Sequence, residues 1–402
     1  MIKHFFIYGF GNVFAGAIPF LLLPYLTANL SPDEMGTVAF IESLIMLCAP
    51  IVVLGIDGSY CAFFHKNSAK GQRKLITSLL VLSGSIGLLL LPIVAAIVHL
   101  KLLPVDLDNV WIYALAFVFF AMAINALAGA EFQMNNKPIG FSLIKVLSAL
   151  FSAIVTILAI SFLNLSTEGR LLGIYFGPVI IASFWIISLT LKKEYEFFPL
   201  SLNMIKKGLN FGVGMLMHSR SAIFFFASDR IIIGYLIGSE ALGEYSVAVQ
   251  IGMIMSLAQN TFSQVWTPHT FKLFSEKCEM IYKKQARISI GGLFLMSIAF
   301  AAITPLLYKY FIDVRYSQLS EVTYWVIATF FFLGVYKVFV VKFFYFEKTK
   351  ALAVITTTCS LVNIILTVML VQNLGVIGAA IATCISSFIF MVVVWNRSLH
   401  FA

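Results

Sequence analysis

The sequence predicts an all-α integral membrane protein with twelve transmembrane helices, and three observations support this prediction. First, 60% of the 402 residues are apolar and only 11% are charged, whereas about a quarter of the residues in a soluble domain are charged. Second, the apolar residues form long runs such as Ile86–Val98 and Val354–Val371, without the alternation typical of outer-membrane strands. Third, the connections between runs are short. A water-soluble enzyme is therefore excluded.

The spans are placed where about 20 predominantly apolar residues follow one another. Six of them fall in residues 1–191, predicted as an N-terminal lobe, and six in residues 209–402, predicted as a C-terminal lobe. Residues 192–208 are predicted as a cytoplasmic linker. The predicted spans are 5–26, 38–62, 75–99, 110–130, 138–163, 171–191, 209–236, 244–267, 286–307, 321–344, 351–372 and 377–395.

Lysine and arginine are concentrated in alternate loops. Nineteen of the 27 lie at the two termini, in loops that follow even-numbered spans or at the span ends that border those loops; four lie in the other loops, and four lie deeper within spans. An excess of positive charge marks the cytoplasmic side of a membrane protein, so both termini are predicted to be cytoplasmic. The formal charge of +9 is explained by this topology, and nucleic acid is not a predicted partner.

The two halves share a loop pattern at an offset of 207 residues. Asp33–Gly36 and Glu240–Gly243 each place an acidic residue three positions before a glycine, and a span follows. The glycine can turn the chain, and the acidic residue is favoured at a helix N-terminus by the helix dipole. Gly169–Gly173 and Gly375–Gly378 match more loosely at the sixth and twelfth spans. Because each half has six spans, the repeat is predicted to be parallel, about an axis along the membrane normal.

Two segments carry a resemblance to a known family. Residues 22–36 (LLPYLTANLSPDEMG) and 228–246 (SDRIIIGYLIGSEALGEYS) resemble the corresponding outer loops of Wzx-type O-antigen and polysaccharide flippases of the multidrug/oligosaccharidyl-lipid/polysaccharide exporter superfamily. The resemblance implies a MATE-like fold with two six-helix lobes around a central cavity, in the bacterial inner membrane. It implies alternating access, no cofactor, and a cargo of undecaprenyl-pyrophosphate-linked oligosaccharide moved from the cytoplasmic to the periplasmic leaflet. Membrane lipids, a polysaccharide polymerase and a chain-length regulator are the other partners it suggests.

Such a cargo needs cations inside the membrane for its pyrophosphate, and intramembrane charges are costly and usually functional. Arg220, Lys145 and Lys337 are therefore the candidate cavity residues. Arg220 lies nearest mid-membrane, and it either lines the cavity or forms a buried ion pair, since it projects away from the polar stripe of its own helix. Lys145 belongs to a polar face of one helix. Snorkelling to the interface remains an alternative for both lysines, and close helix packing is one for the serines of that face. The polar face comprises Ser142, Lys145, Ser148, Ser152 and Thr156.

Two carboxylates within the spans are candidates for ion coupling. Asp57 is the first choice, although it equally fits a structural pair with Lys145, and Glu42 lies nearer the outer end. Asp229 and Arg230 are interpreted as a structural network near the outer surface. The cysteines and histidines show no metal-ligand spacing, and the sequence lacks a phosphate-binding loop, so neither a metal site nor a catalytic residue is predicted.

Two other functions compete with the flippase hypothesis. A cation-coupled drug antiporter of the same fold is expected to have a carboxylate in a mostly apolar pocket, and the intramembrane cations argue against it. A polysaccharide polymerase or lipid-dependent glycosyltransferase is expected to have a sizeable periplasmic loop, whereas the largest outer loop here is 308–320. The sequence therefore favours a transporter over an enzyme.

Overall fold

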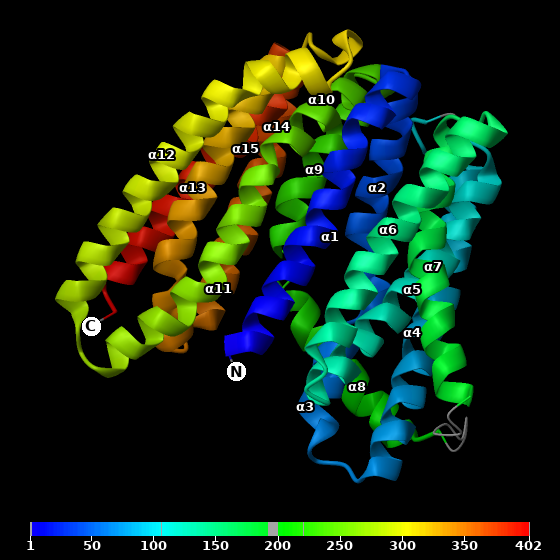
Figure 1. Cartoon of the computed structure of the whole chain (residues 1–402), viewed down its shortest axis with the longest axis vertical. Coiled ribbons are helices and arrows are strands. Elements are labelled where there is room, and N and C mark those ends of the chain that lie inside the picture. Colours follow the sequence, from blue (N-terminus) through cyan, green and yellow to red (C-terminus); the bar gives the residue numbers. More distant parts are fainter. Residues whose placement is uncertain (1, 106, 192–199, 220, 402) are drawn as a thin grey trace. The chain divides into compact units, whose positions relative to one another are not determined.

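The structure, a computed structural model, describes residues 2–105, 107–191, 200–219 and 221–401. These residues form fifteen α-helices and one short 3₁₀ helix (Figure 1). Eleven segments are long and apolar enough to cross a membrane, and residues 202–236, the region of the seventh predicted span, contribute two further helices. The helices are α1 (Ile2–Asn29), α2 (Pro32–Val53), α3 (Ile56–Phe64), α4 (Ala69–His99), α5 (Asn109–Met134), α6 (Pro138–Leu163), α7 (Thr167–Leu191), α8 (Leu202–Ser219), α9 (Ser221–Leu236), α10 (Ser239–Gly252), α11 (Ile254–Ser275), α12 (Glu279–Phe311), η1 (Val314–Tyr316), α13 (Ser320–Tyr345), α14 (Thr349–Leu374) and α15 (Val376–Leu399).

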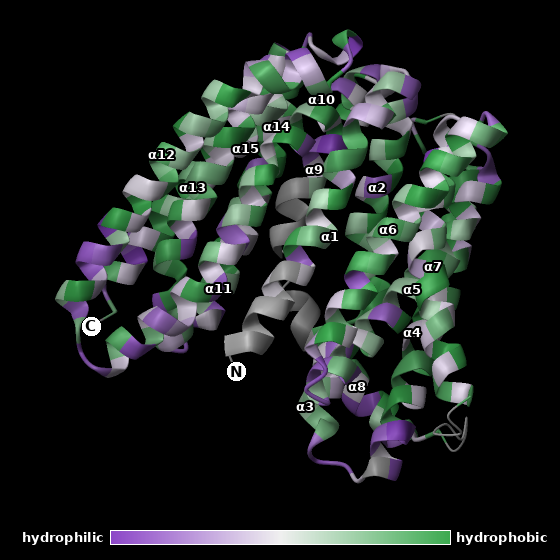
Figure 2. Cartoon of the chain, viewed as in Figure 1, coloured by the Kyte–Doolittle hydropathy of each residue, from purple (hydrophilic) through white to green (hydrophobic). Residues whose placement is uncertain are grey.

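Hydrophobic residues predominate along most of these helices, and hydrophilic residues gather mainly at their ends and in the loops (Figure 2). Some helices extend beyond the apolar spans into polar sequence. At the start of α12, for example, Glu279 and Lys283 form an ion pair of 3.2 Å one turn apart. Such pairs stabilise a solvated helical turn. A criterion based on hydrophobicity alone therefore places the start of this helix too late, at residue 286 instead of Glu279.

The chain divides into two compact units. One comprises residues 1–19 and 41–220, and the other comprises residues 20–40 and 221–402. These units differ from the predicted lobes, because residues 20–40 group with the second unit and the α8 segment groups with the first. The chain therefore passes between units within α1, within α2 and between α8 and α9.

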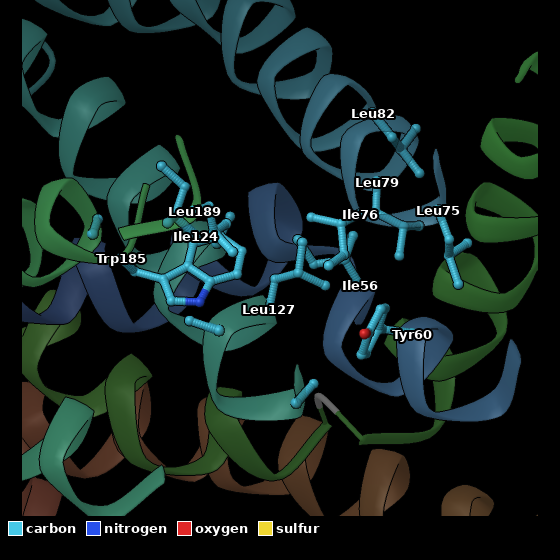
Figure 3. Close-up of a cluster of buried hydrophobic side chains, with 14 of the residues drawn as sticks. Ile56, Tyr60, Leu75, Ile76, Leu79, Leu82, Ile124, Leu127, Trp185 and Leu189 are labelled. Atoms are coloured by element: carbon cyan, nitrogen blue, oxygen red, sulfur yellow. The ribbon is translucent and has the colours of Figure 1, made fainter. Parts of the chain in front are cut away.

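In the first unit, α5 packs against α3, α4, α6 and α7. Figure 3 shows a cluster of buried side chains where α3, α4, α5 and α7 meet. Burial of Tyr60, Leu79 and Leu127 is nearly complete. The indole of Trp185 lies at the edge of this cluster and donates a 2.9 Å hydrogen bond to the Glu131 carboxylate, so its polar atom is satisfied. This core anchors the first unit.

The second predicted span is interrupted in the structure. Leu54 and Gly55 have φ angles of 46° and 60°, which are left-handed and end α2 shortly after Pro50. The Val52 carbonyl instead accepts a 2.8 Å bond from the Ser83 hydroxyl. A β-carbon on Gly212 would overlap the Leu54 carbonyl, so this glycine lets α8 approach the break. The interruption places Asp57 in the first turn of a new helix, α3.

In the second unit, α13 packs against α10, α11, α12 and α15. The shared loop pattern found in the sequence forms a crossing between the starts of α2 and α10. A β-carbon on Gly36 would overlap the Ser239 carbonyl, and one on Gly243 would overlap the Pro32 carbonyl. An offset of 207 residues converts Gly36 into Gly243 and Pro32 into Ser239, so each contact is the counterpart of the other. This reciprocity is what a two-fold relation between the repeated segments produces.

The loop around η1 also holds the turn between α1 and α2. The Arg315 guanidinium donates from Nη2 to the Thr27 and Ala28 carbonyls at 2.9 and 3.1 Å. The buried Tyr316 hydroxyl donates to the Leu30 carbonyl at 2.9 Å. These bonds satisfy carbonyls at the end of α1 that have no partner within the helix. They connect residues 20–40 to the second unit, with which these residues group.

Candidate functional site

The first unit contains a cavity of about 730 Å³, within the range of small-molecule sites. Residues of α5, α6 and α7 contribute most of its wall, and α1, α2 and α3 complete it. Apolar side chains such as Ile144 and Ile174 alternate on this wall with charged groups, amides and hydroxyls. The polar and charged lining residues are Glu42, Asp57, Asn125, Gln133, Lys145, Ser148, Ser152 and Arg170.

The polar face predicted on the fifth span lies along this cavity. Lys145, Ser148 and Ser152 line it, and the fully buried Thr156 continues the face. The same face serves helix packing, because Gly169, Gly173 and Gly177 of α7 approach α6 so closely that a β-carbon at each would meet α6 atoms under 3 Å away. Small residues at intervals of four let membrane helices pack closely. Cavity lining and close helix packing, the two roles predicted for the serines, therefore belong to the same face of α6.

Lys145 is held at the cavity wall by two neighbours. Its ammonium group donates a 2.8 Å hydrogen bond to the Asn12 side-chain oxygen of α1. It also lies 4.6 Å from the centre of the Phe141 ring, a favourable position for a cation. The head group is thus engaged within the first unit while its side chain remains exposed to the cavity.

Asp57 faces the same cavity from the first turn of α3. The positive end of the helix dipole favours a carboxylate at that position. Among the residues that the structure describes, Asp57 forms no ion pair with Lys145, whose partner is Asn12. The cavity therefore holds both the cationic and the acidic candidate from the first half of the chain.

An ion pair that the sequence analysis did not identify completes the wall. Arg170 Nη2 lies 2.9 Å from Glu42 Oε1, and Arg170 Nη1 donates to the Thr156 hydroxyl at 3.4 Å. The predicted span 171–191 leaves Arg170 in the preceding outer loop, but the structure places it inside α7 with only 8% of its surface exposed. The signal available in the sequence was the glycine spacing at 169, 173 and 177, which indicates that Arg170 lies on a packed helix.

The remaining predicted residues lie elsewhere. Lys337, on α13 in the second unit, donates a 2.7 Å bond to the Asn260 side chain of α11, so it does not line this cavity. Asp229 accepts a 2.5 Å bond from the buried Tyr245 hydroxyl, and Arg230 Nη2 lies 3.8 Å from the Met253 sulfur. Arg220 lies outside the described residues. Within the described ranges, no group of three or more His, Cys, Asp or Glu side chains is placed to hold a metal ion.

A cavity with these groups can bind a polar, charged molecule inside an otherwise apolar protein. Two cations favour anionic groups, and amides and hydroxyls suit the hydroxyls of a sugar. The two carboxylates are available to bind a cation or a proton. The long apolar helices and the internal polar cavity together define a helical membrane protein with a site for a polar molecule.

Solved transporters share this fold. A multidrug resistance MATE family transporter of the MOP superfamily, in an inward-facing conformation, superposes with a TM-score of 0.77 at 14% identity, over 96% of this chain and 94% of that one. The lipid II flippase MurJ, in an inward closed conformation, gives a TM-score of 0.74 at 14% identity, over 100% and 88%. The predicted all-α, MATE-like fold is confirmed.

Comparison of sequences identifies the family. Residues 1–274 match the model of the polysaccharide biosynthesis protein family, and the chain belongs to that family. A membrane protein of Haemophilus influenzae is 25% identical over 312 residues, which cover 76% of this chain and 72% of that protein. A protein of the Lsg locus of the same organism is 22% identical over 286 residues, covering 69% and 67%. The family resemblance noted in the two loop segments is thereby confirmed.

Proposed function

We propose that this protein is a flippase that moves an undecaprenyl-pyrophosphate-linked oligosaccharide, such as an O-antigen repeat unit, from the cytoplasmic to the periplasmic leaflet of a bacterial inner membrane. The observation that carries the proposal is the polar cavity of the first unit, lined by Lys145 on a continuous polar face of α6. Membership of the polysaccharide biosynthesis family supports the cargo class. The likeness to a lipid II flippase supports a lipid-linked cargo.

The chemistry of the cavity suits each polar part of this cargo. A pyrophosphate cannot enter hydrocarbon without compensating positive charge, and Lys145 supplies an ammonium group at the wall. Ser148, Ser152 and Asn125 offer hydrogen bonds to sugar hydroxyls. The lipid tail needs no polar partner and can stay in the membrane. Movement proceeds by alternating access, without a covalent step, so the protein is proposed to be a transporter and not an enzyme.

The orientation and the partners are part of the same proposal. Both termini lie in the cytoplasm, as the loop charges predict. A polysaccharide polymerase and a chain-length regulator act on the cargo after it reaches the outer leaflet. Lys337 and Arg220 are proposed as cationic contacts in the second half of the chain, and Asp57 as an ion-coupling residue.

Lys145 provides the direct test. In a strain whose own flippase is deleted, Lys145→Gln should remain as abundant in membranes as the wild type, by immunoblot, while surface polysaccharide falls at least about tenfold on a gel. Lys145→Arg should retain part of the activity, because the charge survives. The matched control is Lys309→Gln, since Lys309 is also an exposed lysine beside an aromatic ring but lies at the end of α12. Normal polysaccharide from Lys145→Gln would contradict the role of Lys145 in cargo binding.

A drug antiporter of the same fold is the second candidate. The observation that favours it is the pair of carboxylates, Glu42 and Asp57, on the cavity wall, because cation-coupled exchange needs a group that binds a proton or metal cation. The flippase and antiporter functions can be distinguished in one strain, by measuring surface polysaccharide and dye efflux together. Cation-driven efflux of a cationic dye by the wild type, without restored polysaccharide, would support the antiporter and contradict the flippase.

A further inference from the structure

The guanidinium of Arg170 uses only part of its hydrogen-bonding capacity. Its Nη2 donates to one oxygen of Glu42 at 2.9 Å, and its Nη1 makes a long bond of 3.4 Å to Thr156. Its Nε is buried and has no hydrogen-bond partner. A buried donor without an acceptor is costly, and more so on a charged group. The Nε–Nη2 edge is therefore an incompletely occupied fork on a residue that lines the cavity.

The two members of this ion pair differ in their freedom to move. The Arg170 side chain is 9% exposed, whereas that of Glu42 is 43% exposed, and both line the cavity. Arg170 is fixed because α7 packs tightly on α6 through Gly169 and Gly173 on either side of it. The carboxylate of Glu42 can turn into the cavity, while the guanidinium cannot follow it.

The unused edge has the geometry of a known ligand class. A guanidinium fork matches two oxygens of a carboxylate or a phosphate, and Glu42 currently supplies one oxygen to it. A phosphate entering the cavity can offer two oxygens, to Nε and to Nη2, and so satisfy the donor that Glu42 leaves without a partner. The structure thus contains a cation whose present partner is weaker than the one its geometry accepts.

We propose that Arg170 is an anion-binding site in the cavity and that Glu42 is its resting counter-ion, which a phosphate group of the cargo displaces. The identity of the cargo rests on the flippase function proposed above. Arg170 contacts Thr156, which lies eleven residues beyond Lys145 on α6, so its contact point on α6 is about 16 Å along the helix axis from the position of Lys145, at 1.5 Å per residue. Lys145 and Arg170 therefore offer two separate binding positions for negative charge along the polar face of α6.

The exchange makes Glu42 a competitor of the ligand, and this can be measured without transport. The full-length protein is placed in nanodiscs, and binding of inorganic pyrophosphate is followed by calorimetry. Glu42→Gln should tighten binding about tenfold, within the range of ordinary coupling between sites. Arg170→Gln should weaken it at least about tenfold. In the Arg170→Gln background, Glu42→Gln should no longer tighten binding, because the competition requires the guanidinium.

A second ion pair in the chain supplies the matched control. Arg315 and Asp313 form an ion pair of 2.9 Å beside η1 in the second unit. Asp313→Asn therefore also removes the carboxylate partner of an arginine, but it should leave pyrophosphate binding unchanged. Unfolding temperatures of all variants verify that they are folded. If Arg170→Gln does not fold, the comparison of Glu42→Gln with Asp313→Asn still decides the matter.

Three results would overturn the exchange. These are no pyrophosphate binding by the wild type, no tightening in Glu42→Gln, and equal tightening in Asp313→Asn. The outcome is separable from that of the flippase proposal. A protein that shows the exchange but restores no surface polysaccharide keeps the anion site and loses the proposed cargo. One that restores polysaccharide without any effect of Glu42→Gln on pyrophosphate binding keeps the function and loses the exchange.

Discussion

A single methyl group at Gly36 or Gly243 tests the reciprocal crossing between α2 and α10. A β-carbon at either position would overlap a backbone carbonyl of the other helix, that of Ser239 or that of Pro32. Backbone atoms in a helical turn cannot rotate away as a side chain can. Gly36→Ala and Gly243→Ala should therefore each force the two helices apart and destabilise the second unit.

The magnitude follows from the nature of the obstacle. An extra methyl group in a well-packed core costs about 1–3 kcal/mol, and a rigid backbone obstacle places this site in the upper half of that range. Separation also weakens the hydrogen bond from the Ser239 hydroxyl to the Asp33 carboxylate. One separation relieves both overlaps, so the double variant should cost less than the sum of the two single variants.

The measurement is thermal unfolding of the purified protein in detergent, followed by tryptophan fluorescence. For a unit of about 200 residues, 1 kcal/mol corresponds to about 2–4 °C, so each variant should unfold roughly 4–12 °C below the wild type. Gly291→Ala is the matched control, because Gly291 lies in α12 with no atom within 4 Å of an added β-carbon. It should unfold at or above the wild-type temperature, since alanine favours helix over glycine. If Gly36→Ala is as harmless as Gly291→Ala, or if the double variant is additive, the reasoning is wrong.

Three further predictions address topology, packing and pH. In a background without the native cysteines, a cysteine at Glu168 should react with an impermeant maleimide in intact cells and one at Asn67 should not; the reverse pattern would invert the topology. Gly173→Leu should reduce the amount of inserted protein on an immunoblot, because the side chain would collide with the α6 backbone, and normal abundance would contradict the close packing. Hydrogen bonding from Arg315 holds the pKa of the Asp313 carboxyl below its usual value. The stability from ionised Asp313 is therefore present above its unfolded pKa of about 3.9 and is lost as the pH falls through the lower folded pKa. The unfolding temperature of the wild type should fall more steeply across that window than that of Asp313→Asn, and equal slopes would remove the pair from the pH response.

Local features of the chain were sufficient to predict its class and the positions of its long apolar segments. A membrane helix must satisfy its backbone within itself and present apolar side chains to lipid, so its signal lies in consecutive residues. For the same reason the polar face of α6, with Lys145, Ser148 and Ser152, could be found from helical periodicity alone. The similarity between Asp33–Gly36 and Glu240–Gly243 likewise identified the segments that meet at the crossing.

Properties that depend on contacts between distant residues could not be read in this way. The sequence indicates neither that Leu54 and Gly55 interrupt the second span nor that Glu42, 128 residues away along the chain, is the partner of Arg170. Arg170 resembles a loop cation when its neighbours along the chain are considered, and only the packing of α7 on α6 buries it. Residues 20–40 likewise group with the second unit, to which the bonds from Arg315 and Tyr316 connect them. Hydrophobicity is a property of each residue, whereas burial, pairing and the choice of neighbour are set by the assembled helices, and for that reason the tertiary structure alone located the ion pair at the cavity.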